Sequence, residues 1–391
     1  MSQNDVIIIG GGISGMSLAH NCAKAGLKPL VLDKNGQMGG TFNTCRIDDF
    51  WFELGAHTCY NSYGTLVDLL RETGSLEKIT KPDSVGYKLI TKDGIKSIMS
   101  QMNILELALS LPRMFGAKMA GETVESFYSK MFGKKNFARV IGPMFNAVIC
   151  QKSNDFPADM LFKKRPRRKE VLKKFSLVGG LQSITDAIAS DPAVETVTGK
   201  EVQGIEFTAD VFTVTTSDGS TFQAKYLALA TPSEPAAKLL QSSFPEIAGK
   251  LASLLAEKVE TLGVIVKKED VKIGPIAALA ATDEIFYSFV SRDTFPDPRY
   301  RAFAFHFKAA AGDRETRLQR IAEVIGTGNF EHIATAEHVI PSLRLGHKEK
   351  IAELDGLLAG TPLLLSGNYF SGIAIEDCVA RSLQESKRLK H

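Results

Sequence analysis

The stretch that decides the fold is Val6-Ile-Ile-Ile9, Gly10-Gly-Gly12-Ile-Ser-Gly15 and, after a helix-like run to about Ala25, Leu30-Val-Leu32-Asp33. The apolar runs predict two buried parallel strands joined by a helix. The first glycine permits a tight turn from strand to helix, the second lets the backbone approach a pyrophosphate, and the third allows close packing of the helix.

The start of this helix is a predicted phosphate site, because free N–H groups and the positive end of the helix dipole meet there. Asp33, at the tip of the second strand, can accept hydrogen bonds from ribose hydroxyls, and its charge repels the extra phosphate of NADP. Lys34 adjoins it in the predicted cofactor site. The contacts predicted for the glycine turn come from Gly10, Gly12, Ile13, Ser14 and Gly15.

Composition places the chain among ordinary folded proteins. Its 391 residues predict two domains, and a formal net charge of +3 argues against a general nucleic-acid binder. The five scattered cysteines predict reduced thiols in the cytoplasm rather than a disulfide framework, and no metal site is predicted. The N-terminus enters the first strand directly, so we expect no signal peptide, and no apolar run reaches about 18 residues, so we expect no membrane-spanning helix.

The pattern of strands and helices predicts an α/β fold in which the nucleotide domain is assembled from separate segments. We expect residues 1–75, 171–240 and 345–391 to form this domain. Residues 76–170 and 241–344 then form an inserted substrate-binding domain with a helical portion. A hairpin over 211–222, turning at Asp218-Gly219, is predicted within the nucleotide domain.

Two further glycine clusters follow the acid. Gly39-Gly40-Thr41 lets the backbone approach something flat or phosphorylated. Gly55-Ala56-His57, preceded by Glu53-Leu54, leaves room for a ring system against the chain. We include all six residues of the two clusters in the predicted cofactor site.

The order of these motifs resembles that of the FAD-dependent flavin amine oxidase superfamily, which includes protoporphyrinogen oxidases and phytoene desaturases. The stretch Leu364 to Val379 is similar to the last flavin motif of the protoporphyrinogen/coproporphyrinogen oxidase branch. Weaker echoes lie at Glu125-Ser126-Phe127, Phe132-Gly133, Pro143 and Gly179-Gly180-Leu181. Gln37 stands where the family usually has Arg, Asp33 where it has Glu, and Ala374 replaces a glycine.

The resemblance implies a Rossmann-type FAD-binding domain with an inserted α+β substrate domain and non-covalently bound FAD. It extends the cofactor site to Val202, Gly367, Asn368, Gly372, Ile373 and Ala374. Helix N–H groups near residues 373–375 would stabilise the negative charge of a reduced flavin. No second glycine fingerprint is present, so we expect no NAD(P)H domain.

Family enzymes pass a hydride from a C–H bond to flavin N5, which requires positioning more than a side-chain acid or base. The catalytic residues are therefore not indicated, and the candidates that could face the flavin are His57, Tyr369 and Phe370. A structural role is the alternative for each of the three.

A basic run covers Lys163 to Lys174. It is either a solvated loop or a dock for substrate propionates, an anionic lipid surface or an acidic redox partner. Tetrapyrroles carry several carboxylates, so Lys163, Arg165, Arg167 and Arg168 are the predicted substrate contacts.

The leading hypothesis is a porphyrinogen oxidase. A flavin amine oxidase, a desaturase-like enzyme, an isomerase that uses reduced flavin and a non-catalytic FAD-binding scaffold stay open. We expect a small-molecule substrate and a cytoplasmic protein, with peripheral membrane contact an open alternative. The oligomeric state is not indicated.

Overall fold

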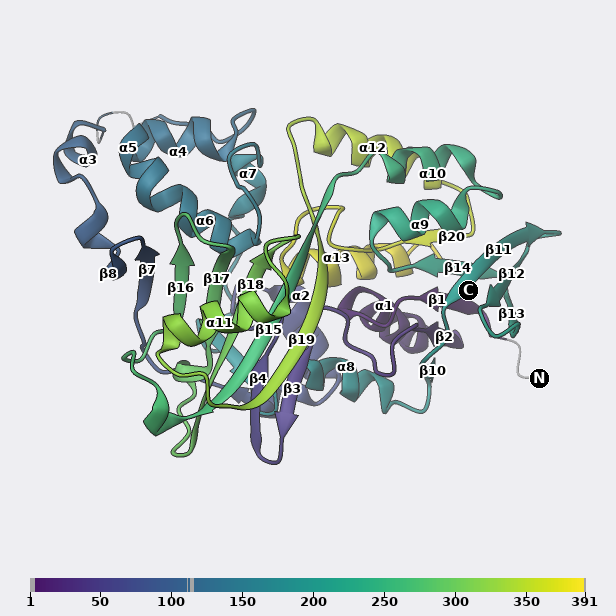
Figure 1. Cartoon of the computed structure of the whole chain (residues 1–391). Coiled ribbons are helices and arrows are strands. Elements are labelled where there is room, and N and C mark those ends of the chain that lie inside the picture. The colour runs from purple at the N-terminus through teal and green to yellow at the C-terminus, as the bar shows by residue number, and fades with distance from the viewer. Residues whose placement is uncertain (1–3, 111, 113–115, 390–391) are drawn as a thin grey trace.

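A parallel sheet forms the nucleotide domain in the computed structural model, which describes residues 4–110, 112 and 116–389 (Figure 1). Its strand order is β10-β2-β1-β14-β20, and every neighbouring pair is parallel. The strands are β1 (Val6–Ile9), β2 (Pro29–Leu32), β10 (Glu195–Val197), β14 (Tyr226–Leu229) and β20 (Leu363–Leu365). In a sheet of this kind, ligands bind beyond the carboxyl ends of the central strands.

Helices cover both faces of this sheet. Alternate residues of β1 enter two separate cores, with Val6 and Ile8 in one and Ile7 and Ile9 in the other. Burial of each such side chain contributes about 1.5–3 kcal/mol. The first face is covered by α1 (Ile13–Lys24), α2 (Gly64–Glu72), α8 (Gln182–Ala189) and α13 (Ile375–Ser386). The second face is covered by α9 (Ser233–Leu240), α10 (Pro245–Ala252) and α12 (His347–Leu358).

The position of α10 corrects one predicted boundary. Ile247, Ala248 and Leu251 pack in the same core as Leu227 and Leu229 of β14. The nucleotide domain therefore continues past residue 240 to the end of α10. The apolar spacing in α10 indicates which side of the helix faces a core. It does not indicate which of the two sheets the helix covers.

A seven-stranded mixed sheet forms the second domain, at the centre and left of Figure 1. Its order is β19-β15-β18-β17-β16-β7-β8. The strands are β7 (Tyr87–Thr91), β8 (Gly94–Ser97), β15 (Ala256–Lys267), β16 (Ala278–Ala281), β17 (Phe286–Ser291), β18 (Tyr300–Lys308) and β19 (Phe330–Pro341). Helix α11 (Arg314–Ile325) covers one face through a phenylalanine-rich core.

The other face of this sheet is lined by small side chains and meets the nucleotide domain. Ala302, Ala304 and Ala336 pack there against Phe50 and Phe52. These phenylalanines lie on a hairpin of β3 (Thr44–Ile47) and β4 (Phe50–Glu53). The hairpin thus joins the two domains.

Short strands and helices complete the chain. The predicted hairpin over 211–222 is confirmed by the sheet of β11 (Val202–Thr208), β12 (Val211–Thr216) and β13 (Thr221–Ala224). Strands β5 (Cys59–Tyr60), β6 (Ile79–Thr80) and β9 (Lys174–Leu177) form another small sheet. The helical portion contains α3 (Ile104–Ser110), α4 (Val124–Phe132), α5 (Lys134–Asn136), a π-helical turn (Phe137–Ile141), α6 (Gly142–Ile149) and α7 (Ala158–Leu161). Short 3-10 turns lie at Ser75–Lys78, Met99–Gln101, Lys268–Asp270 and Arg292–Thr294.

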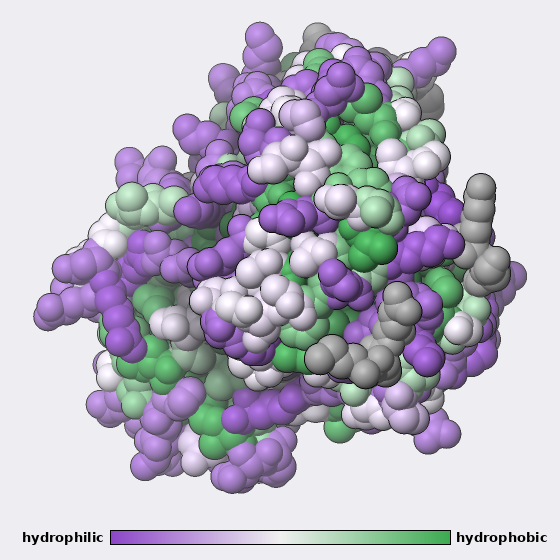
Figure 2. All heavy atoms as spheres, turned by 90° about the vertical axis from the view of Figure 1, so that its right-hand side faces the viewer, coloured by the Kyte–Doolittle hydropathy of each residue, from purple (hydrophilic) through white to green (hydrophobic). Residues whose placement is uncertain are grey.

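Among the described helices, none is long and apolar enough to span a bilayer. Figure 2 shows the side of the nucleotide domain, where polar side chains cover most of the face and apolar ones gather in a strip between them.

Candidate cofactor cleft and active site

The turn between β1 and α1 presents bare backbone at the carboxyl edge of the parallel sheet. Gly10 has a φ of +106°, and a Cβ atom there would lie 2.8 Å from the carbonyl oxygen of Ala230. Helix α1 begins after Gly12 with no side-chain cap and no acid in its first turn. The first-turn N–H groups, which belong to Ile13, Ser14 and Gly15, are therefore available for a phosphate.

Asp33 stands beside this turn. Its Oδ2 accepts a hydrogen bond from Gly11 N at 2.6 Å, and its Oδ1 accepts one from Asn35 N at 2.8 Å. Asp33 is buried and Lys34 is exposed. Val202 is half-buried and begins the strand β11. This strand starts near Asp33, since Lys200 N, two residues before it, donates to Asp33 O at 2.9 Å.

The second glycine cluster lies directly against the first. Gly39 N donates to Gly11 O at 2.9 Å. Gly40 has a φ of +60°, and a Cβ atom there would lie 2.9 Å from the Cα atom of Gly12. No residue but glycine fits this crossing of two backbones without a shift.

The third cluster, Gly55-Ala56-His57, is bonded to the second through the backbone. Ala56 N donates to Thr41 O at 3.1 Å. Gly55, Ala56 and His57 are all partly or largely exposed, although the neighbouring Leu54 is buried. The three clusters are thus joined by backbone contacts, and Gly12, Gly40, Gly55 and Ala56 are at least partly exposed along them.

The C-terminal loop approaches this surface at α13. Helix α13 packs along α1, and Ser382 Oγ donates to Ser14 O at 2.7 Å. Half-buried Ile373 and Ala374 lie just before the helix, and Ala374 provides no side-chain cap. Two helix N-termini therefore lie on the same side of the parallel sheet.

Two acids in the first turn of α13 are already occupied. The Glu376 carboxylate accepts from Thr65 N and Leu66 N at 2.9 and 3.0 Å, and so caps α2. Asp377 is paired with Lys163 at 2.9 Å and with Arg165 at 2.8 Å. A Cβ atom on Gly372 would lie 2.7 Å from Asp377 Oδ2.

These ion pairs change the interpretation of the basic run. Lys163 and Arg165 hold the start of the run against α13, and Arg168 is paired with Asp68 at 2.8 Å and with Glu170. Arg167 is exposed. Three of the four predicted substrate contacts therefore pair with acids of the chain itself.

Tyr369 and Phe370 lie in the apolar core of the nucleotide domain, with 1% and 2% of their surfaces exposed. Their rings therefore pack in the core, which is the structural alternative to a place beside the flavin. Gly367 is buried as well, and a Cβ atom there would lie 2.6 Å from the Tyr369 ring. Asn368, between them, is half-buried.

Three histidines, His57, His306 and His338, lie where the Gly55-Ala56-His57 cluster meets the seven-stranded sheet. His306 Nδ1 shares a hydrogen bond of 2.9 Å with Thr261 Oγ1, and His338 Nε2 lies 2.9 Å from Leu54 O. Burial, together with the nearby His338 and His57, lowers the pKa of His306 to about 3. Burial also lowers the pKa of His57, whose ring lies deep in the protein but faces open space.

Glu53 is a buried carboxyl group that organises the entry to α8. It accepts hydrogen bonds from Leu181 N and Thr44 Oγ1, each at 2.7 Å. Burial raises its pKa to about 7, against the lowering effect of these two bonds.

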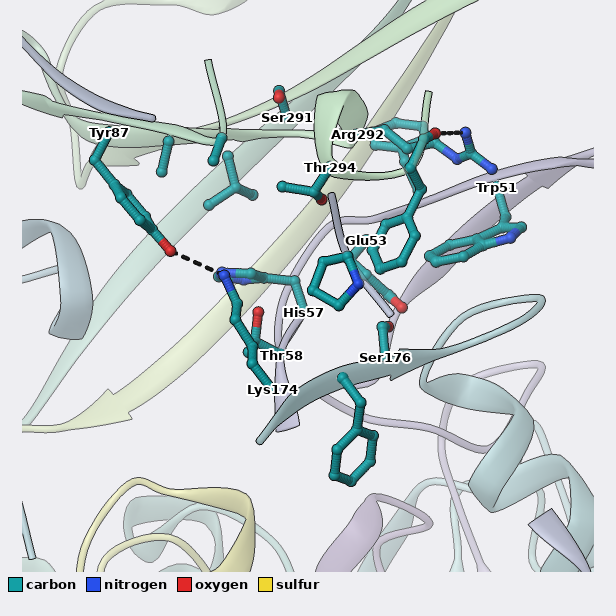
Figure 3. A pocket seen from close by; sticks show the side chains of 17 residues that line it. Trp51, Glu53, His57, Thr58, Tyr87, Lys174, Ser176, Ser291, Arg292 and Thr294 are labelled. Carbon is teal, nitrogen blue, oxygen red and sulfur yellow. Dashed lines mark hydrogen bonds between the residues drawn. The ribbon is translucent and has the colours of Figure 1, made fainter. Parts of the chain in front are cut away.

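A cavity of about 50 Å³ opens beside His57, between the nucleotide domain and the small-residue face of the sheet (Figure 3). This volume is far below that of a macrocycle. The labelled side chains around it are Trp51, Glu53, His57, Thr58, Tyr87, Lys174, Ser176, Ser291, Arg292 and Thr294. In the part of the chain that the structure describes, no group of three or more His, Cys, Asp or Glu residues could hold a metal ion.

The sequence analysis missed Thr261, His306 and most of the cavity lining. His306 belongs to the alternation Ala302, Ala304, His306 within one strand, which places a polar residue on a face of small ones. That alternation is the sequence feature that could have identified His306. The lining of the cavity comes from segments far apart in the sequence, which no local pattern brings together.

Two family models match the chain. Residues 8–73 match "NAD(P)-binding Rossmann-like domain", and residues 118–267 match "Flavin containing amine oxidoreductase". A probable flavin-containing monoamine oxidase A from Dictyostelium discoideum is 24% identical over 58% of this chain and 57% of its own length. The mitochondrial protoporphyrinogen oxidase of Nicotiana tabacum is 26% identical over 49% of this chain and 48% of its own length. The aligned part thus spans about half the length of these relatives.

Solved structures share the fold over almost the whole chain. A proposed protoporphyrinogen oxidase from Exiguobacterium sp. 255-15 has a TM-score of 0.78 at 18% identity, covering 99% of this chain and 98% of its own. A reduced UDP-galactopyranose mutase has a TM-score of 0.75 at 14% identity, covering 98% and 95%. The predicted fold, a Rossmann-type domain with an inserted α+β domain, is confirmed.

Proposed function

We propose that the chain is a member of the flavin-containing amine oxidoreductase superfamily and an FAD-dependent oxidoreductase that converts a porphyrinogen to a porphyrin. The observation that carries the cofactor assignment is the backbone contact between the three glycine clusters beside the uncapped start of α1, with the uncapped start of α13 on the same face of the sheet. The relatives named as protoporphyrinogen oxidases and the likeness of the last flavin motif support the substrate.

The chain has the groups that FAD requires at these clusters. The uncapped first turn of α1 provides N–H donors for the pyrophosphate, and Gly12 and Gly40 leave no side chain in the way. Asp33 lies where it can accept hydrogen bonds from a ribose. When bound, FAD supplies an acceptor for a hydride from a substrate C–H bond.

The chain's own residues orient and shield the reacting groups. The N-terminus of α13 would provide positive partial charge to the ring end of a bound cofactor, and the pairs of Asp377 with Lys163 and Arg165 offset the acid in this first turn. His57 faces the open space without a charge at neutral pH, because its pKa is lowered. The small-residue face of the sheet closes the opposite side.

The test is anaerobic mixing of the FAD-loaded protein with proto- or coproporphyrinogen. We expect the flavin absorbance near about 450 nm to bleach. The alternative substrate is an amine, since the monoamine oxidase relative also aligns over more than half of the chain. Bleaching by benzylamine but not by porphyrinogens would replace the proposed substrate with an amine, and bleaching by neither would support a non-catalytic scaffold.

A further inference from the structure

The cavity beside His57 carries a cation at each end. Figure 3 shows Lys174, Tyr87 and His57 gathered at one end, and Arg292 and Trp51 at the other. Apolar side chains form part of the wall between them, including Phe295 and Val290. The cavity is thus a narrow, partly apolar slot with a cation at each end.

Neither cation has a carboxylate partner among the residues that the structure describes. Lys174 Nζ donates to the neutral Tyr87 hydroxyl at 2.9 Å. The Arg292 guanidinium stacks over the rings of Phe50 and Trp51, at 4.5 and 5.0 Å from their centroids, and donates to Phe295 O. Its Nε atom is buried without a hydrogen-bond partner.

The nearby acids do not neutralise the charge of Lys174. Glu53 is bonded to Leu181 N and Thr44 Oγ1, and its raised pKa leaves it partly protonated at neutral pH. Asp49 and Asp297 are both paired with Arg299, at 2.6 and 3.2 Å. Lys174 is therefore the cation of the cavity without a nearby compensating acid, whereas the charges of Asp49 and Asp297 act on both Arg292 and Arg299.

Ser176 provides an independent sign of a ligand. Its side chain lines the same cavity, only 1% of the residue is exposed, and its Oγ atom has no partner in the described chain. A buried hydroxyl without a partner costs about 1–3 kcal/mol. A ligand acceptor in the cavity would remove that cost.

We propose that this cavity binds a carboxylate group of the substrate, with Lys174 as the main charge and the Ser176 hydroxyl as a neutral donor. Arg292 adds a second positive charge at the far end. The cavity admits one carboxylate with its first carbons, so the body of the substrate lies outside it, toward His57. The assignment of this anion to a substrate rests on the proposed function; the binding of a carboxylate does not.

The cavity contains its own reporter, since Trp51 is the only tryptophan of the chain. We would titrate the FAD-loaded protein with propionate and with its neutral isostere propionamide, and follow Trp51 emission and the heat of binding. We expect saturable binding of propionate and much weaker binding of propionamide. Lys174→Met should weaken propionate binding roughly 10-fold or more, and Ser176→Ala roughly 2- to 10-fold.

Lys173→Met is the matched control, because Lys173 is the exposed neighbour of Lys174 and does not line the cavity. Equal affinity for propionate and propionamide, or equal losses in the two lysine variants, would overturn the proposal. If Ser176→Ala binds propionate with the affinity of the unmodified protein, Ser176 is not part of the site. Flavin absorbance, recorded on each sample, tests the proposed function separately: a colourless protein that still binds propionate through Lys174 would refute that function and keep the anion site.

Discussion

Replacing Glu53 with glutamine should change the pH dependence of stability. Burial raises the pKa of Glu53 from 4.5 to about 7 in the folded protein. The folded state therefore holds this proton more tightly than the unfolded state does. Stability contributed by the protonated acid is present below the unfolded pKa and is lost as the pH rises through about 7. A shift of this size corresponds to about 3 kcal/mol.

Glutamine should keep both hydrogen bonds and remove the charge. Its Oε1 can accept from Leu181 N, and its amide can donate to Thr44 Oγ1, which already accepts from Gln182 N. Between about pH 5 and pH 8, the unfolding free energy of Glu53→Gln should therefore gain about 2 kcal/mol relative to that of the unmodified protein.

The assay is urea unfolding over this pH range with saturating FAD, and flavin absorbance confirms equal cofactor content. Glu77→Gln is the control, since Glu77 is exposed. The reasoning fails if the difference in unfolding free energy between Glu53→Gln and the unmodified protein is the same at every pH.

Three further substitutions probe the cofactor cleft. Gly40→Ala should weaken FAD binding by about 2 kcal/mol, because the new Cβ atom meets the Cα atom of Gly12. Calorimetry measures this loss, and an unchanged affinity for FAD would contradict the close crossing of the two backbones. Asp33→Ala removes the predicted ribose acceptor and should cost roughly 10-fold or more in FAD affinity, whereas equal affinities for FAD would exclude that role. Asp377→Asn should raise the two-electron flavin potential by roughly 30 mV, because the paired cations Lys163 and Arg165 lose their counter-charge; spectroelectrochemistry would show no change if α13 does not face the flavin.

Local patterns were sufficient for the glycine turn at the start of the nucleotide domain. The run from Val6 to Gly15 is governed by short-range chemistry, since a buried strand, a tight turn and a helix start follow each other directly. The same holds for the crossing of Gly40 over Gly12, which demands glycine at position 40. Such features are visible in a sequence because each residue type has one dominant physical reason to be there.

Long-range packing decided what the sequence could not show. The motif around Tyr369 is typical of a flavin loop, yet its ring fills a core between the sheet and the helices of the second face. The basic run left a solvated loop and a docking site open, and Asp377, 214 positions from Lys163, pairs with it. The partner of a charge cannot be read from its own segment, so both assignments needed the fold.

The most direct test of the cofactor assignment is a crystal structure of the protein with FAD. We expect the pyrophosphate within hydrogen-bond distance of the first-turn N–H groups of α1, and the flavin ring against Gly55 to His57. A flavin ring placed away from these residues, or a glycine turn that stays free of phosphate at saturating FAD, would contradict it.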